Sequence, residues 1–279
     1  MKSRKTFIRS CILAILVLQP SRFFAQNAPG TGDPACPLDH GNWKFIPELS
    51  DEFNGKSLDT AKWYPFNPGW KGREPGYFSP ANVKVSKGNL VLTSKTETLK
   101  NIPPEYHTFT TAAVKSKVRM LYGYYEVRFR PMDSRASSAF WFYAIDPGLW
   151  TEIDVFEICG RHPDKAWEHK YFATSHAMTV PGVPEKVSDN VEWVTPYRLA
   201  DSFQVAGLEW NENIIRWYLN GEVIRTRENT YWHQPLDMNF DSETMPEWFG
   251  LPDPKDKPGH FLVDYVRVWQ PMQGAVSKP

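Results

Sequence analysis

Three carboxylic acids lie within one apolar segment of the chain, residues 150–158. Only isoleucine, valine and phenylalanine separate Glu152, Asp154 and Glu157 from one another. Burying acids in an apolar strand is costly unless their chemistry is needed. Glycoside hydrolysis needs two carboxyl groups, and retaining enzymes hold them about 5–5.5 Å apart, one as nucleophile and one as general acid/base. The segment therefore predicts a retaining glycosidase.

The spacing of the acids requires an irregular strand. A two-residue period places Glu152 and Asp154 on one face and sends Glu157 to the other. One extra residue in a β-bulge returns Glu157 to the shared face. Neighbouring side chains on that face are then roughly 6–7 Å apart, and they can lean toward each other. The middle acid would keep the nucleophile ionised while the other glutamate keeps its proton.

Two other interpretations of this segment are a solvent-facing edge strand and a metal site. An edge strand would carry lysine or arginine among its acids, and residues 150–158 contain neither. Calcium prefers oxygen ligands on a glycine-rich loop rather than apolar spacers. A non-catalytic carbohydrate-binding module has no reason to keep three acids in one strand. These points favour catalysis.

The elements that position the acids are predicted to be β-strands. Several segments alternate with the two-residue period of a sheet or form strand–turn–strand pairs: 83–86, 88–94, 123–130, 138–144, 203–210, 214–219 and 261–269. Asn220-Gly221 is a strong hairpin signal. No convincing amphipathic helix exceeds two turns. Many short strands with turns between them indicate an all-β sandwich or barrel, and a sandwich face can curve into a groove.

The chain begins with features of a secretory signal peptide. A basic start is followed by an apolar run at 11–18 and a small residue before a plausible cleavage point. We expect residues 1–25 to be removed, and the enzyme to be secreted or periplasmic. A membrane anchor is the alternative, but the run is shorter than the roughly 20 residues that span a bilayer. Residues 26–40 are predicted to be a flexible lead-in, 41–271 a single catalytic domain and 272–279 a tail.

Composition limits the partners. The 32 basic and 32 acidic residues balance, which gives no nucleic-acid footprint, and no membrane partner is indicated. The 12 tryptophans suit stacking against sugar rings. We expect a monomer. Cys36 and Cys159 could pair in an oxidising compartment; alternatively Cys159 is a buried free thiol and Cys36 lies in a loose tail. Neither has zinc-site spacing.

Over nearly the whole mature chain the sequence resembles glycoside hydrolase family 16. The segment Glu152–Glu157 fits the bulged ExDxxE pattern of that family, and residues 49–55, 138–142 and 264–269 resemble its opening, the strand before the catalytic one and its closing strand. The resemblance implies a β-jelly-roll sandwich of two antiparallel sheets with a cleft on the concave face. It also implies Glu152 as nucleophile, Asp154 as its assistant, Glu157 as acid/base, and no cofactor for catalysis.

Local motifs point to a substrate. Trp70-Lys71-Gly72-Arg73 looks like the W-x-G-R segment of β-porphyranases, whereas agarases tend to have proline in place of the arginine. Glu243 with residues 248–252 also looks like the agarase and porphyranase group. The resemblance implies endo-cleavage of β-1,4-galactosidic bonds in a sulfated or neutral agar-type galactan, with porphyran favoured. A β-agarase and a laminarinase-type β-glucanase are the alternatives, although laminarinases lack that arginine.

Further residues are candidate substrate contacts. Arg73 beside Trp70 would offer a planar fork to a sulfate group; the alternatives are a surface salt bridge for Arg73 and core packing for Trp70. Arg135 is a second candidate sulfate contact. Trp141 is expected on the groove floor, or else in the core. His176 follows the catalytic strand and either approaches the cleft or is structural.

The family resemblance also implies a structural calcium ion away from the cleft. Gly88, through its carbonyl, and Asp264, through its carboxylate, match the usual ligand positions. Asp264 is unusual within an apolar strand. The alternative is that Asp264 caps a neighbouring loop.

Overall fold

The computed structural model describes residues 33–38 and 42–272. The predicted signal peptide and nearly all of the predicted C-terminal tail lie outside these residues. Within the described ranges, no helix is long and apolar enough to cross a membrane.

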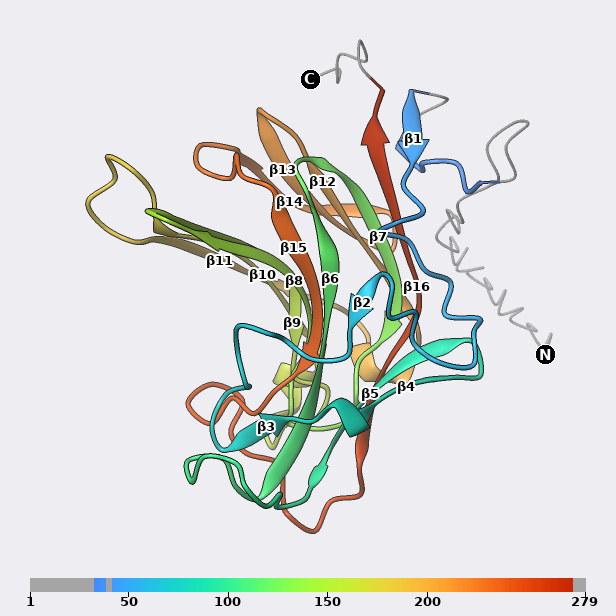
Figure 1. Ribbon diagram of the computed structural model, residues 1–279, viewed down its shortest axis with the longest axis vertical. Coiled ribbons are helices and arrows are strands. Elements are labelled where there is room, and N and C mark those ends of the chain that lie inside the picture. Colours follow the sequence, from blue (N-terminus) through green and yellow to red (C-terminus); the bar gives the residue numbers. More distant parts are fainter. Residues whose placement is uncertain (1–32, 39–41, 273–279) are drawn as a thin grey trace, which may run out of the picture.

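Two antiparallel sheets stack face to face, as Figure 1 shows. The first sheet has the order β11 (Val187–Val194), β10 (Lys170–Thr179), β9 (Leu149–Ile158), β8 (Ser138–Asp146), β15 (Leu236–Ser242), β6 (Phe109–Met120). The second has the order β5 (Asn89–Thr96), β16 (Gly259–Pro271), β7 (Gly123–Arg130), β12 (Gln204–Trp210), β13 (Ile214–Leu219), β14 (Glu222–Glu228). Pairing of β5 with β6 joins the two sheets into one hydrogen-bonded set.

Short elements complete the sheets. β1 (Trp43–Phe45) pairs with β16, β2 (Trp63–Tyr64) and β3 (Gly76–Phe78) pair with β6, and β4 (Val83–Ser86) pairs with β5. The helical elements of the described residues are three 3-10 turns: η1 (Pro80–Asn82), η2 (Lys165–His169) and η3 (Leu199–Asp201). The all-β sandwich predicted from the sequence is therefore confirmed.

The main core lies between the two sheets. Alternation along β9 sends Ile153 and Ile158 inward, and both are fully buried. Phe156 stacks on Phe129 of the opposite sheet, with ring centroids 3.9 Å apart. This apolar underside fixes β9, whose other face carries the acids. Burial of large apolar side chains at roughly 1.5–3 kcal/mol each offsets the cost of placing acids on that strand.

The predicted hairpin at Asn220-Gly221 joins β13 to β14. Both residues have positive φ, 50° and 85°, which is the backbone of a type I′ turn. The twist of that turn matches the twist of the flanking strands, so the dipeptide fixes the register of the hairpin.

Part of the predicted flexible lead-in packs against the sandwich instead. Cys36 is buried against Tyr124 and Trp269, and the Trp269 indole donates to the Pro34 carbonyl at 2.8 Å. The expectation of a loose tail is therefore wrong for residues 33–38. They pack on an apolar surface formed by β16 and β7, which the sequence alone does not reveal. Cys159 lies in a different cluster, as a buried free thiol.

Candidate active site

A β-bulge in β9 turns all three acids to one face. Phe140 of β8 pairs with Phe156, but the next residue, Trp141, pairs with Asp154, so Val155 is the extra residue. Val155 and Phe156 both enter the core, and Glu157 returns to the face of the other acids. The bulge that the spacing predicts is therefore present.

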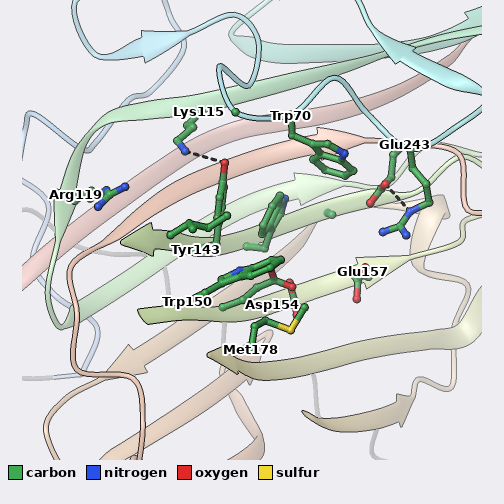
Figure 2. Close-up of a pocket in the computed structure, with 15 residues that line it drawn as sticks. Trp70, Lys115, Arg119, Tyr143, Trp150, Asp154, Glu157, Met178 and Glu243 are labelled. Carbon is green, nitrogen blue, oxygen red and sulfur yellow. Dashed lines mark hydrogen bonds and ion pairs between the residues drawn. The ribbon is translucent and has the colours of Figure 1, made fainter. Parts of the chain in front are cut away.

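The acids face a cleft of about 590 Å³. Figure 2 shows Lys115 and Arg119 toward one end of it and Glu157 and Glu243 toward the other. The cleft is lined by Gly69, Trp70, Arg73, Lys115, Arg119, Ala139, Trp141, Tyr143, Ile145, Trp150, Glu152, Asp154, Glu157, Met178 and Glu243. Both aromatic rings and charged groups line this surface.

The electrostatics of the cleft favour neutral acids. Burial is the main reason that the pKa of Glu157 rises to about 8 and that of Glu152 to about 7. Burial raises the pKa of Asp154 as well, and repulsion from both glutamates adds to it. Arg73 opposes the rise at Glu152 and Glu157. Raised pKa values suit a carboxyl group that must carry a proton at neutral pH, and the expected roles of Glu152 as nucleophile and Glu157 as acid/base rest on the family pattern.

Two tryptophans hold the backbone of β9 from the core side. The Trp232 indole donates to the Glu152 carbonyl at 2.7 Å, and the Trp217 indole donates to the Asp154 carbonyl at 2.9 Å. Both tryptophans are fully buried. These contacts hold the backbone of β9 in place at Glu152 and Asp154.

His176 contacts two of the acids. It is the cross-strand partner of Glu152, on β10. Its Nε2 atom lies 3.6 Å from Asp154 Oδ2 and 3.9 Å from Glu152 Oε1, and its Nδ1 atom is 2.8 Å from Ser188 Oγ. Burial, with Lys186 and Arg225 nearby, lowers the pKa of His176 to about 4, so the ring is neutral. The geometry fits both interpretations of His176: it lies against two of the acids, and it is hydrogen-bonded to its neighbour Ser188 without lining the cleft itself.

Trp70, Arg73 and Trp141 line the cleft together. The Arg73 Nε atom donates to Glu243 Oε2 at 2.8 Å. The Arg73 side chain is 52% exposed and that of Glu243 only 5%, so a buried acid anchors a half-exposed cation. Trp70 meets Trp141 edge to face at 6.1 Å, and the Trp141 indole donates to Asp241 at 2.7 Å. Neither tryptophan is a core residue.

Several lining residues were not anticipated from the sequence. The Lys115 ammonium donates to the Tyr143 hydroxyl at 3.0 Å, and it forms an ion pair with Asp237. Tyr143 stacks on Trp141 with centroids 4.8 Å apart. Because β6 was not recognised as a strand, Lys115 and Arg119 could not be assigned to a face. The period-two pattern from residue 113 to 119 was the available signal.

Arg135 does not line the cleft. Its Nη1 atom donates to the Leu251 carbonyl at 3.2 Å. That bond ties Arg135 to the loop that follows Gly250. A sulfate contact at Arg135 stays a prediction that the observed contacts do not support.

Gly88 lies in the turn between β4 and β5, and Asp264 lies on β16 of the second sheet. Asp264 is an extra residue of a bulge in β16, because Val263 pairs with Phe129 and Tyr265 with Arg128. Its carboxylate accepts a hydrogen bond from Arg128. Gly88 has a φ of +70°, and a side chain at this position would meet the Asn54 amide oxygen. The calcium site stays a prediction, and an ion there would compete with Arg128.

Comparison with known proteins identifies the family. Residues 43–271 match the model of the GH16 domain of β-porphyranases A–D. The chain is 32% identical to β-porphyranase B of Zobellia galactanivorans, over 76% of this chain and 78% of that protein. It is 27% identical to the κ-carrageenase of Pseudoalteromonas carrageenovora, over 85% and 67% of the two chains.

The fold agrees with that match. The crystal structure of porphyranase B from Zobellia galactanivorans superposes with a TM-score of 0.73 at 25% identity, covering 88% of this chain and 99% of that one. The expected jelly-roll sandwich is confirmed, and catalysis in such enzymes needs no cofactor. The protein belongs to glycoside hydrolase family 16.

Proposed function

We propose that this hydrolase is a secreted or periplasmic endo-acting enzyme that cleaves β-1,4-galactosidic bonds of porphyran with retention of configuration. The observation that best supports porphyran as the substrate is the half-exposed Arg73 guanidinium, which a buried Glu243 holds inside the cleft. The match to a porphyranase domain model supports the same choice.

In the proposed mechanism, the Glu152 carboxylate attacks the anomeric carbon while Glu157 gives its proton to the glycosidic oxygen. The leaving sugar departs with that proton, and a covalent glycosyl ester on Glu152 remains. Glu157, now ionised, takes a proton from water as the water attacks the ester, and this step restores both side chains. Asp154 assists Glu152 between the two steps.

Arg73 is suited to bind a sulfate. Its Nε atom is used by Glu243, which leaves both Nη nitrogens as parallel donors for two sulfate oxygens. Glu243 fixes the plane of the guanidinium, so little side-chain entropy is lost when an anion binds. Trp70 lies beside Arg73, with the guanidinium carbon 6.0 Å from its ring centroid. A galactose ring stacked on Trp70 would bring its sulfate to Arg73.

The test is reducing-end release from porphyran, agarose, κ-carrageenan and laminarin, with product configuration followed by NMR. We expect the highest rate on porphyran and a first product of β configuration. A higher rate on agarose or laminarin would replace the porphyran assignment with the agarase or laminarinase alternative. An inverted product would exclude Glu152 as a nucleophile.

A further inference from the structure

We propose that Glu152, Asp154 and His176 form a binding site for a divalent metal ion of the zinc class, and that the ion inhibits the enzyme by competing with substrate. This inference goes beyond the proposed function. It rests on the arrangement of one nitrogen and two oxygen ligand atoms: Glu152 and Asp154 line the cleft, and His176 lies against them from the neighbouring strand β10.

The ligand atoms already have nearly the spacing that such an ion needs. Zinc bonds of about 2.0–2.2 Å in a tetrahedron place neighbouring ligand atoms roughly 3.3–3.5 Å apart. The Nε2 atom of His176 is 3.6 Å from Asp154 Oδ2 and 3.9 Å from Glu152 Oε1. All three ligand atoms lie within 4.8 Å of one another. Small side-chain adjustments would therefore close the site.

Asp154 provides an independent indication of a ligand. Its side chain is 4% exposed, and Oδ2 is a buried oxygen with no hydrogen-bond partner. A buried, unsatisfied oxygen gains by meeting a cation or a donor. The Nε2 atom of His176 is too distant for a hydrogen bond to it, and an ion between the two atoms would satisfy both.

Ser188 supplies the outer contact that a metal-bound histidine requires. Coordination through Nε2 places the ring proton on Nδ1, and that proton can be donated to Ser188 Oγ at 2.8 Å. The two indole bonds to the carbonyls of Glu152 and Asp154 keep the acids in place.

The donor set selects the class of ion. A neutral imidazole with two carboxylates suits zinc, whereas magnesium and calcium prefer ligand sets made only of oxygen. Because Glu152 is both a ligand and the proposed nucleophile, the ion and the sugar cannot occupy the site together.

The experiment uses the mature full-length protein and zinc chloride. Titration calorimetry and thermal melts measure binding without any substrate, so failure of the porphyran assignment would leave these readouts unaffected. We expect a zinc-dependent rise in melting temperature, and inhibition that raises KM and leaves kcat unchanged. His176→Asn should weaken zinc binding at least about tenfold, and Ser188→Ala about tenfold. The matched control His260→Asn, on an exposed residue of the second sheet, should bind zinc like the wild type.

Three results would overturn the proposal. One is no measurable zinc binding to the wild-type protein. Another is equal zinc affinity in the wild type, His176→Asn and Ser188→Ala, with circular dichroism showing that the variants are folded. The third is inhibition that leaves KM unchanged and disappears in Cys159→Ser, because that pattern would place the ion at a thiol.

Discussion

Two groups of acids in this protein have opposite surroundings. In the cleft, Glu152 and Glu157 are partly buried without a cation bonded to either of them, and their pKa values are raised, chiefly by loss of contact with water. Beyond the end of β9, Asp133 accepts hydrogen bonds from Arg161 and Arg198, and the Arg161 bond is the main reason that its pKa is lowered. An ionised carboxyl group therefore destabilises the fold in the cleft and stabilises it in the Asp133 network.

The pH dependence of stability follows from those signs. A group whose pKa is raised on folding stabilises the folded state at low pH, and that contribution is lost as pH rises through the folded pKa. A group whose pKa is lowered stabilises above its unfolded pKa, and that contribution is lost as pH falls. The cleft acids should thus weaken the fold near pH 7–8 and above, because the folded pKa values of Glu152 and Glu157 are about 7 and about 8. The Asp133 network should weaken it in acid.

The largest expected effect comes from removing a cleft acid. Glu152→Gln and Glu157→Gln should each reduce kcat by about a thousandfold or more, because each removes a group that forms or breaks a bond. The melting temperature should be unchanged at pH 5 and higher than that of the wild type at pH 9, since an ionised buried acid is gone. Assays and melts at both pH values measure the two effects. A variant less stable than the wild type at pH 9 would contradict the assigned burial cost.

Azide separates the roles of the two glutamates. It should restore activity to Glu157→Ala, because a small anion can attack the glycosyl ester without general-base help. With Glu152→Ala, azide should not restore the formation of a product of retained configuration. The opposite pattern would exchange the two assignments.

The next effect concerns specificity. Arg73→Ala should lower kcat/KM on porphyran about ten- to a hundredfold, the equivalent of one desolvated charge-assisted contact of roughly 1.5–3 kcal/mol. On neutral agarose stretches the same change should have little effect. Arg73→Lys should recover part of the loss, because it offers a point charge without the fork. The matched control Trp70→Ala should harm both substrates alike, and an unchanged rate for Arg73→Ala on porphyran would remove the proposed sulfate contact.

How far these features could be predicted from the sequence depended on their range along the chain. The acids and the bulge lie within one strand, so alternation together with one extra residue was enough to predict their shared face. The anchor of Arg73 is Glu243, 170 residues away, and no local pattern pairs them. Trp217 and Trp232 support β9 from distant elements, which only the stacking of the sheets reveals.

Irregular backbone limited the rest. Asp264 disturbs the alternation of β16 because it is the extra residue of a bulge. The sequence interpretation explained this unusual acid by a metal ion. The structure shows a hydrogen bond from Arg128 to the same carboxylate, which no local pattern predicts. The segment 33–38 has loop composition, yet it packs on the sandwich because Cys36 fits beside Trp269. Composition indicates the local conformation that a segment prefers, but not whether an apolar surface elsewhere in the fold will bind it.

A smaller effect, on stability, should follow from removing Arg198, the cation that pairs with Glu168 and Asp133. Arg198 donates to Glu168 at 2.8 Å and to the Gly160 carbonyl at 2.7 Å, and it also contacts Asp133. Arg198→Met should lower the free energy of unfolding by about 1–3 kcal/mol at pH 7, because the buried Glu168 carboxylate loses one of its two cationic partners. The loss is limited because Lys165 still donates to Glu168. The loss should shrink toward pH 3, and activity at low temperature should be unchanged. Urea unfolding at several pH values measures it, and a loss independent of pH would point to packing instead of charge.

The smallest effect concerns Asp264. The Arg128–Asp264 pair is about one-third exposed on both sides, so it contributes less than about 1 kcal/mol. If calcium binds at Gly88 and Asp264, chelation should lower the melting temperature by only about 2–4 °C, because Arg128 takes over the carboxylate when the ion leaves. Arg128→Ala should enlarge that change, since Asp264 then has the ion as its main partner. Thermal melts of both proteins with calcium and with excess chelator measure the difference. If calcium and chelator give the same curve within each protein, Asp264 holds no ion, and a lower melting temperature of Arg128→Ala in both conditions would then assign stabilisation of the bulge to Arg128.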